Sequence, residues 1–174
     1  MRMREILLGA LLIGCVGCTS APAPEAKAPD TKAVDEAAIK ALEDRFIAAF
    51  KARDVNAIMA NYVPGQSLIV FDATPPRQYT GADAYKKDWE ELFAAFPGAT
   101  DFSLSDLDVT VGGDVAYGHS IQHASLTDKA GKKLELTIRV TDGYKKISGQ
   151  WLISHEHVSV PVDLATLKPD LNSK

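Results

Sequence analysis

The segment Trp151-Leu152-Ile153-Ser154-His155-Glu156-His157-Val158-Ser159-Val160-Pro161 is the most diagnostic stretch of the 174-residue chain. Its β-branched, aromatic and polar residues predict a long strand over about 150–160. Successive side chains of a strand point to opposite faces. One face would carry Leu152, Ser154, Glu156, Val158 and Val160, and the other Trp151, Ile153, His155, His157 and Ser159. Both sets are half apolar, so the alternation alone does not tell which of them faces the core.

Three further strands precede this one. The residues alternate with a period of two over about 102–111, 114–126 and 132–147. Turn residues separate these segments: Gly112-Gly113-Asp114, Asp128-Lys129-Ala130-Gly131 and Ser148-Gly149. Because short turns join antiparallel neighbours, the C-terminal half is predicted to be an antiparallel meander.

The part of the chain before the meander is predicted to be mainly helical. Asp30-Thr31 can cap a first helix whose apolar residues recur at helical spacing. Asp54 can cap a short second helix that runs to about Tyr62, and 81–96 has the pattern of a third. A short apolar strand at 67–71 lies between the second and third helices. This order predicts an α+β fold, with helices on one face of a curved sheet.

Three sequence features together resemble the C-terminal signature of SnoaL-like (nuclear transport factor 2-like) domains. They are the strand Trp151–Pro161, the segment Arg139-Val140-Thr141-Asp142 and the turn Gly149-Gln150-Trp151. The association domain of calcium/calmodulin-dependent protein kinases is similar too, since it ends in a comparable W-x-x-x-H-x-H-x-S strand. The resemblance covers roughly 34–163 and implies a cone-shaped, strongly curved antiparallel sheet with three N-terminal helices. Such domains include ketosteroid isomerases, cyclases, dehydratases, epoxide hydrolases and non-enzymes, so the site must decide the function.

Charge and motif content exclude several classes of protein. The formal net charge is −4 and the pI near 5.5, whereas nucleic-acid binding normally needs a basic patch. No P-loop, dinucleotide fingerprint or G-x-S-x-G motif is present, and no cofactor is expected. The two cysteines, Cys15 and Cys18, both precede the predicted domain, so its fold should contain no disulfide.

The first residues predict export and lipid anchoring. A short basic start and an apolar run suit a signal peptide over 1–14. Leu12-Ile13-Gly14-Cys15 resembles the lipobox of bacterial lipoproteins, which implies lipidation of Cys15, with Cys18 as the alternative. The predicted location is therefore the cell envelope, on the periplasmic side of the outer membrane of a Gram-negative bacterium. An inner-membrane location or an ordinary secreted protein are the alternatives.

Behind the signal peptide the chain divides into three parts. The Ala/Pro-rich segment 15–31 cannot bury apolar surface and reads as a tether. The SnoaL-like domain is expected over 32–163, and 164–174 is expected to be a C-terminal tail. Contact with a membrane is expected through the lipid anchor only.

Strand parity predicts which residues line the cone. In 132–147 the mostly apolar set from Leu134 to Tyr144 should face inward, with Asp142 as its single carboxylate. In 114–126 the set that contains Tyr117, His119 and His123 is the more apolar and should also face inward. Tyr85 and Trp89 of the third helix would form a wall.

The kinase association domains imply a ligand pocket at the same place. Their pocket cations fall at positions that match His119, Asp142 and Val158, so these three are expected inside. Of these three positions, 142 and 158 carry Asp and Val instead of a basic residue, which argues against a pocket for small carboxylates. The predicted ligand-binding residues are Tyr85, Trp89, Tyr117, His119, His123, Asp142, Tyr144 and Val158.

Catalysis is one of three interpretations of the polar residues in this cone. Asp142, Glu156 and His119 could act as a general acid/base set, because a carboxyl group on an apolar wall has a raised pKa. A buried structural trio and ligand binding without turnover are the alternatives. Asp72, near where isomerase relatives carry a base, is better explained as a turn residue.

The opposite faces of the last two strands predict a homodimer. The residues placed there are Arg139, Trp151, Ile153, His155 and His157. An outward Trp-Ile patch should not stay in water, and relatives commonly dimerise through this face. His155 and His157 lack a third ligand at a recognisable spacing, so no metal site is predicted.

The leading functional hypothesis is a membrane-tethered domain that binds a small, partly apolar molecule. The first alternative is a cofactor-free isomerase, dehydratase or hydrolase that uses Asp142, Glu156 and His119. The second is a structural dimeric envelope protein without a ligand.

Overall fold

The computed structural model describes residues 31–173. The helical elements are α1 (Thr31–Ala52), α2 (Val55–Met59), the 3-10 turn η1 (Gly65–Ser67) and α3 (Ala82–Ala95). The strands are β1 (Ile69–Phe71), β2 (Tyr79–Thr80), β3 (Thr100–Gly112), β4 (Val115–Thr127), β5 (Lys133–Ile147), β6 (Gln150–Ser159), β7 (Val162–Asp163) and β8 (Lys168–Pro169). The predicted signal peptide, both cysteines and all but the last residue of the tether lie outside the described residues. Within 31–173, none of the helices is both long enough and apolar enough to span a bilayer.

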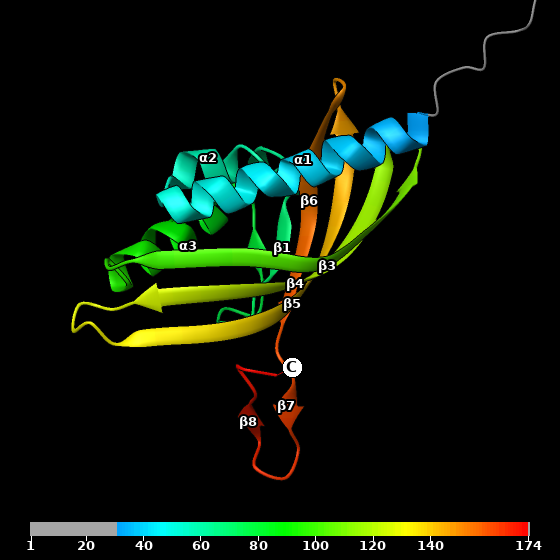
Figure 1. Ribbon diagram of the computed structural model, residues 1–174. Helices are drawn as coiled ribbons and strands as arrows, with labels where there is room; N and C mark the ends of the chain where they lie inside the picture. The colour runs from blue at the N-terminus through cyan, green and yellow to red at the C-terminus, as the bar shows by residue number, and fades with distance from the viewer. Residues whose placement is uncertain (1–30, 174) are drawn as a thin grey trace, which may run out of the picture.

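Six strands form one curved sheet in the order β2-β1-β6-β5-β4-β3. Strands β3 to β6 are the predicted antiparallel meander. β1 joins β6 in parallel, across the long connection through α3 and the meander, so the sheet is mixed and open. Figure 1 shows the three helices gathered on one side of the bent sheet, which confirms the predicted α+β architecture.

The core forms where the apolar stripe of α1 meets the sheet. Ile39, Leu42, Phe46 and Phe50 recur at helical spacing and are all buried. The ring of Phe46 contacts Phe102 of β3, with ring centroids 5.6 Å apart. The cluster of aromatic rings fixes α1 and α3 against the concave face.

α2 begins directly after its predicted cap, Asp54, and ends at Met59, earlier than predicted. The side chain of Asp54 accepts a hydrogen bond from the Ala57 amide at 3.0 Å. The predicted end was near Tyr62, but the backbones of Asn61 and Val63 bond to Ile153 of β6, each at 2.8 Å. The chain leaves the helix because it pairs with the edge of the sheet at this point.

Arg53 fastens the end of α3 to α1. Its guanidinium donates to the carbonyls of Phe93 and Phe96, each at 2.6 Å, and to that of Gly98 at 2.9 Å. These carbonyls belong to the end of the helix and the turn behind it, where intrahelical donors are missing. Arg53 thus holds α3, and with it one wall of the cavity described below.

The predicted orientation of β4 is wrong. Tyr117, His119 and His123 lie exposed on the outer face, whereas Gly118 and Gln122 face the core. A Cβ on Gly118 would lie 3.2 Å from the ring of Tyr144, so the concave face leaves room only for very small residues there. The more apolar set of side chains therefore points outward.

A β-bulge changes which side chains of β6 face the core, so that Trp151 and Ile153 before it and Glu156 after it are all buried. The pairing shifts between Gly143 and Tyr144, whose partners are His155 and Ile153, and Ser154 is the extra residue. Trp151 and Ile153 are therefore buried, which contradicts their predicted place on the outer face. The indole N–H of Trp151 donates to Asp35 of α1 at 2.9 Å.

A short hairpin of β7 and β8 joins the end of the expected domain, 32–163, to the expected tail, 164–174. Its end is attached to the sheet, because the amide of Thr137 donates to the carbonyl of Leu171 at 2.6 Å. In Figure 1 this hairpin extends away from the helices.

Candidate functional site

A cavity of about 480 Å³ lies between α1, α3 and the concave face of β4 to β6. Its aromatic wall consists of Phe46, Phe50, Tyr85, Trp89, Phe96 and Phe102. Its polar lining residues, apart from Thr74 and Tyr85, are Asp72, Asp88, Glu91, Gln122 and Glu156. A mostly apolar cavity with a few polar groups is the usual form of a small-molecule site.

Glu156 is the buried carboxyl group of this cavity. The phenol of Tyr85 donates to its Oε1 at 2.6 Å, and the phenol of Tyr62 donates to its Oε2 at 2.7 Å. Burial raises the pKa of Glu156 to about 7, while the two phenol hydrogen bonds oppose the rise. The group can therefore hold or release a proton near neutral pH.

A second buried layer lies behind Glu156. Asp142 is the direct partner of Glu156 in the β5–β6 ladder, and its Oδ1 has no hydrogen-bond partner among the described residues. Burial and the nearby Glu156 and Glu43 raise the pKa of Asp142 well above its usual value. The phenol of Tyr144 donates to Glu43 at 2.7 Å. Asp142 and Glu43 do not line the cavity themselves.

Asp72 and Asp88 bring two more carboxyl groups to the cavity. Asp72 accepts from the amide and the hydroxyl of Thr74, at 2.9 and 3.1 Å, which is the predicted turn role. It also lines the cavity, which its turn role alone does not indicate. The phenol of Tyr79 donates to Asp88 at 2.6 Å, and burial raises the pKa of Asp88.

The predicted site residues fall into three places. Tyr85, Trp89, Glu156 and Val158 line the cavity. Asp142 and Tyr144 are buried in the layer behind it. Tyr117, His119 and His123 lie on the outer face, so the predicted acid/base trio is not assembled around His119. Within 31–173, no group of three or more His, Cys, Asp or Glu side chains is arranged to hold a metal ion.

The outer face carries three of the five predicted interface residues. Arg139 and His157 are exposed there, and His155 is half-buried. The imidazole Nδ1 of His155 lies 2.9 Å from the carbonyl of Ile69, and its ring centroid is 5.0 Å from that of Phe71. This face therefore differs from the predicted one in lacking Trp151 and Ile153.

Gln122 is a cavity residue that the sequence did not reveal. Its side chain lines the cavity, and its Nε2 donates a long, 3.4 Å hydrogen bond to Ser120. The available signal was the run of small residues Ala116, Gly118 and Ser120 on the same face, because small side chains suit a crowded concave surface. Phe46 and Phe50 were missed as cavity residues, because their place on the apolar stripe of the first helix already gave them a core role.

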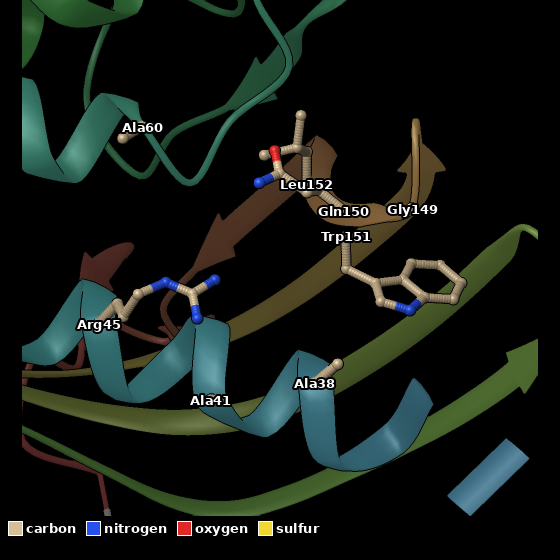
Figure 2. Close-up of a pocket in the computed structure, with 8 residues that line it drawn as sticks. All are labelled: Ala38, Ala41, Arg45, Ala60, Gly149, Gln150, Trp151 and Leu152. Atoms are coloured by element: carbon tan, nitrogen blue, oxygen red, sulfur yellow. The ribbon is translucent and has the colours of Figure 1, made fainter. Parts of the chain in front are cut away.

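A second hollow of about 450 Å³ lies on the far side of α1. Figure 2 shows Ala38, Ala41 and Arg45 of α1 opposite the start of β6, with Trp151 directed toward the helix. It contains no carboxyl group, and Arg45 is its only charged lining residue. Its alanine-rich walls provide few groups that could orient a ligand, so the cavity at Glu156 is the stronger candidate.

Comparisons with known proteins agree with the fold. The model of the SnoaL-like domain family matches residues 39–163. No curated protein matches the chain in sequence. A nuclear transport factor 2-like protein of unknown function from Pseudomonas putida KT2440 is 31% identical, with 82% of this chain and 97% of that chain covered and a TM-score of 0.73.

Two less similar structures share the fold alone. A candidate scytalone dehydratase from Novosphingobium aromaticivorans DSM 12444 is 22% identical over 72% of this chain and 83% of that chain, with a TM-score of 0.65. A candidate calcium/calmodulin dependent protein kinase II association domain from Xanthomonas campestris is 23% identical over 70% and 84%, with a TM-score of 0.61. The family model, the 31% identical structure and the observed architecture agree, and the chain belongs to the SnoaL-like family of nuclear transport factor 2-like domains.

Proposed function

We propose that this domain binds a small, partly apolar molecule in the cavity at Glu156. The observation that carries the proposal is a buried carboxyl group, oriented by two phenols, on the wall of a largely apolar cavity of about 480 Å³. Apolar walls supply affinity through burial, and a few fixed polar groups orient the ligand.

Titration with the neutral apolar dye Nile red tests this proposal. Ala124 lines the cavity, whereas Ala41 lines the hollow of Figure 2, so Ala124→Phe and Ala41→Phe are a matched pair. Saturable one-to-one binding is expected for the wild type and for A41F, with at least about tenfold weaker binding for A124F. Thermal melting shows whether A124F is folded. Unchanged binding by folded A124F would contradict the proposal.

Acid/base catalysis in the same cavity is the second candidate function. It is favoured by the pKa of about 7 at Glu156, because a group that titrates near the working pH transfers protons efficiently. Asp72 is a second carboxyl group on the cavity, and it replaces His119 as the candidate partner. The reaction would be a cofactor-free isomerisation, dehydration or hydrolysis. Turnover that Glu156→Gln abolishes while the fold and ligand binding persist would favour catalysis over binding alone.

Lipid anchoring in the cell envelope is part of the proposed function. It is supported by the resemblance of Leu12-Ile13-Gly14-Cys15 to a lipobox. Incorporation of labelled palmitate in a Gram-negative host should be lost in Cys15→Ala and kept in Cys18→Ala. Loss in C18A alone would make Cys18 the anchor, and no incorporation in the wild type would contradict anchoring.

Self-association through the outer face is the last part of the proposal. His119, Thr141 and His157 are in register across β4, β5 and β6, and Phe71 pairs with His157 at the next strand. The exposed rings of Tyr117 and Phe71 add apolar area to this face. A second copy of the chain would cover it.

A further inference from the structure

The cavity that we propose as the binding site carries charge of one sign. Four of its lining residues are acidic, namely Asp72, Asp88, Glu91 and Glu156, and none is Lys, Arg or His. A ligand inside therefore meets carboxyl groups and apolar surface only, apart from neutral polar groups such as Gln122.

Three of the four carboxyl groups have no cationic partner among the described residues. Glu91 pairs with Lys87, with the two charged atoms 3.5 Å apart. Asp72, Asp88 and Glu156 accept hydrogen bonds from neutral amide, hydroxyl and phenol groups alone. Burial raises the pKa of Asp88 and of Glu156, and the charge of Asp72 raises both further, which is consistent with a negative potential in this region.

Two side chains of the cavity wall have a polar atom without a hydrogen-bond partner in the described part of the chain. Gln122 is 5% exposed, and its side-chain oxygen accepts no hydrogen bond within the described part of the chain. The indole N–H of Trp89, which is 8% exposed, has no acceptor there either. The free oxygen of Gln122 can accept a hydrogen bond from a ligand in the cavity, which would complete its hydrogen bonding.

The aromatic wall suits a positive charge as well. Faces of Trp and Phe rings attract ammonium and guanidinium groups, most strongly where water is excluded. The ring of Trp89 packs against those of Phe46 and Phe50, with ring centroids 5.8 Å apart in each pair. These rings therefore present a continuous aromatic surface to the cavity.

We propose that the molecule bound in this cavity is an amphiphilic amine in its protonated form. Its ammonium group lies between Asp72 and Glu156, with the side-chain oxygen of Gln122 as a further acceptor, and its apolar body lies against the aromatic wall. This inference rests on the proposed binding function. It excludes carboxylates as ligands, because they would be repelled by the acidic lining residues.

A set of three probes with the same ring tests the inference. The probes are 1-naphthalenemethylamine, 1-naphthalenemethanol and 1-naphthoate, which are cationic, neutral and anionic at pH 7.5. Calorimetric titration of the purified protein should give an amine affinity about tenfold above that of the alcohol, with the carboxylate weakest. An amine and an alcohol of equal affinity would overturn the amine inference while small-molecule binding stands. No binding of any probe would contradict the proposed function as well.

Two isosteric variants locate the charge. Asp72→Asn keeps an acceptor for the Thr74 turn and removes the charge, so it should lower the amine-to-alcohol affinity ratio to about three or less. Glu90→Gln removes the same charge from an exposed position of α3 that does not line the cavity, and it should keep the ratio. Equal ratios in D72N and the wild type would overturn the assignment of the ammonium site.

Discussion

Asp142 and Glu156 face each other as direct partners across β5 and β6, and both are buried, with 3% and 5% of their surfaces exposed. Two neighbouring carboxyl groups that are both buried cannot both ionise without a large electrostatic cost. The pair therefore holds protons at a pH where free carboxyl groups would have lost them.

Glu156→Gln should change how stability depends on pH. The folded pKa of Glu156 is about 7 and its ordinary value is 4.5, so the folded state binds more protons than the unfolded chain between them. The free energy of unfolding should therefore fall as pH rises through this window, by on the order of 3 kcal/mol from this group. E156Q lacks this titration, so the pH profile of its urea-unfolding free energy should be flatter. Asp142, Glu43 and Asp88, whose pKa values are also raised, contribute to the slope that remains.

The groups that face Glu156 determine the control for this experiment. They are Tyr62 and Tyr85 by hydrogen bond, and Asp72, Asp142 and Glu43 by charge. Glu90→Gln changes the same charge on the exposed side of α3 and should reproduce the wild-type profile. An E156Q profile parallel to that of the wild type would show that Glu156 does not titrate in this window.

Tyr85→Phe should raise the pKa of Glu156 further. The phenol hydrogen bonds of Tyr85 and Tyr62 stabilise the carboxylate form, and that of Tyr85 is the stronger influence. Tyr62→Phe should act in the same direction with a smaller effect. Titration of the Glu156 carboxyl carbon by ¹³C NMR measures both shifts. A lowered pKa in either variant would contradict the role of the two phenols.

Arg53→Ala should destabilise the fold by roughly 2–3 kcal/mol, because three carbonyls at the end of α3 lose a charged donor. Arg45→Ala is the matched control, since Arg45 lies exposed on α1, has no hydrogen bond or ion pair within 31–173, and should change stability by less than about 0.5 kcal/mol. Chemical denaturation compares the two variants. Equal effects would mean that the contacts of Arg53 do not stabilise α3.

Tyr117→Lys should convert the proposed dimer into a monomer. Tyr117 is 53% exposed on the outer face, and a lysine there would replace apolar contact area of the proposed interface with a charge. Val34→Lys is the control, because Val34 is similarly exposed on α1, away from this face. Size-exclusion chromatography with light scattering gives both masses. A monomeric wild type at micromolar concentration would rule out the proposed dimer.

Most of the architecture was predictable from local signals. The period of two in the last four long strands and the helical stripe of α1 are strong because each recurs over many residues. The strands β2, β7 and β8 were missed, because each has only two residues and such a short segment shows no alternation. The end of α2 was misplaced because pairing with Ile153, a distant residue, competes with the helix.

The candidate site was less predictable, for two structural reasons. By hydrophobicity, the side chains on the same face as Tyr117 should form the inner face of β4. The concave face is too crowded around Gly118 for them, so they point outward. The bulge opposite Gly143 breaks the alternation in β6, so Trp151 and Glu156 both face inward although their parity differs. Both effects depend on contacts between residues that are distant along the chain, which residue alternation within one strand does not predict.

The two tryptophans allow the central claim to be tested in one spectrum. Trp89 lines the proposed cavity, whereas Trp151 lines the hollow of Figure 2, and the chain has only these two. A ¹H–¹⁵N correlation spectrum therefore contains two indole signals, which the variant Trp151→Phe assigns.

The decisive measurement is this spectrum recorded during titration with 1-naphthalenemethanol, a neutral apolar probe. Binding in the cavity at Glu156 predicts a saturable shift of the Trp89 signal, while the Trp151 signal, whose N–H is bonded to Asp35, stays in place. A shift of the Trp151 signal alone, or no shift of either signal at millimolar probe, would contradict the assignment of the cavity as the binding site.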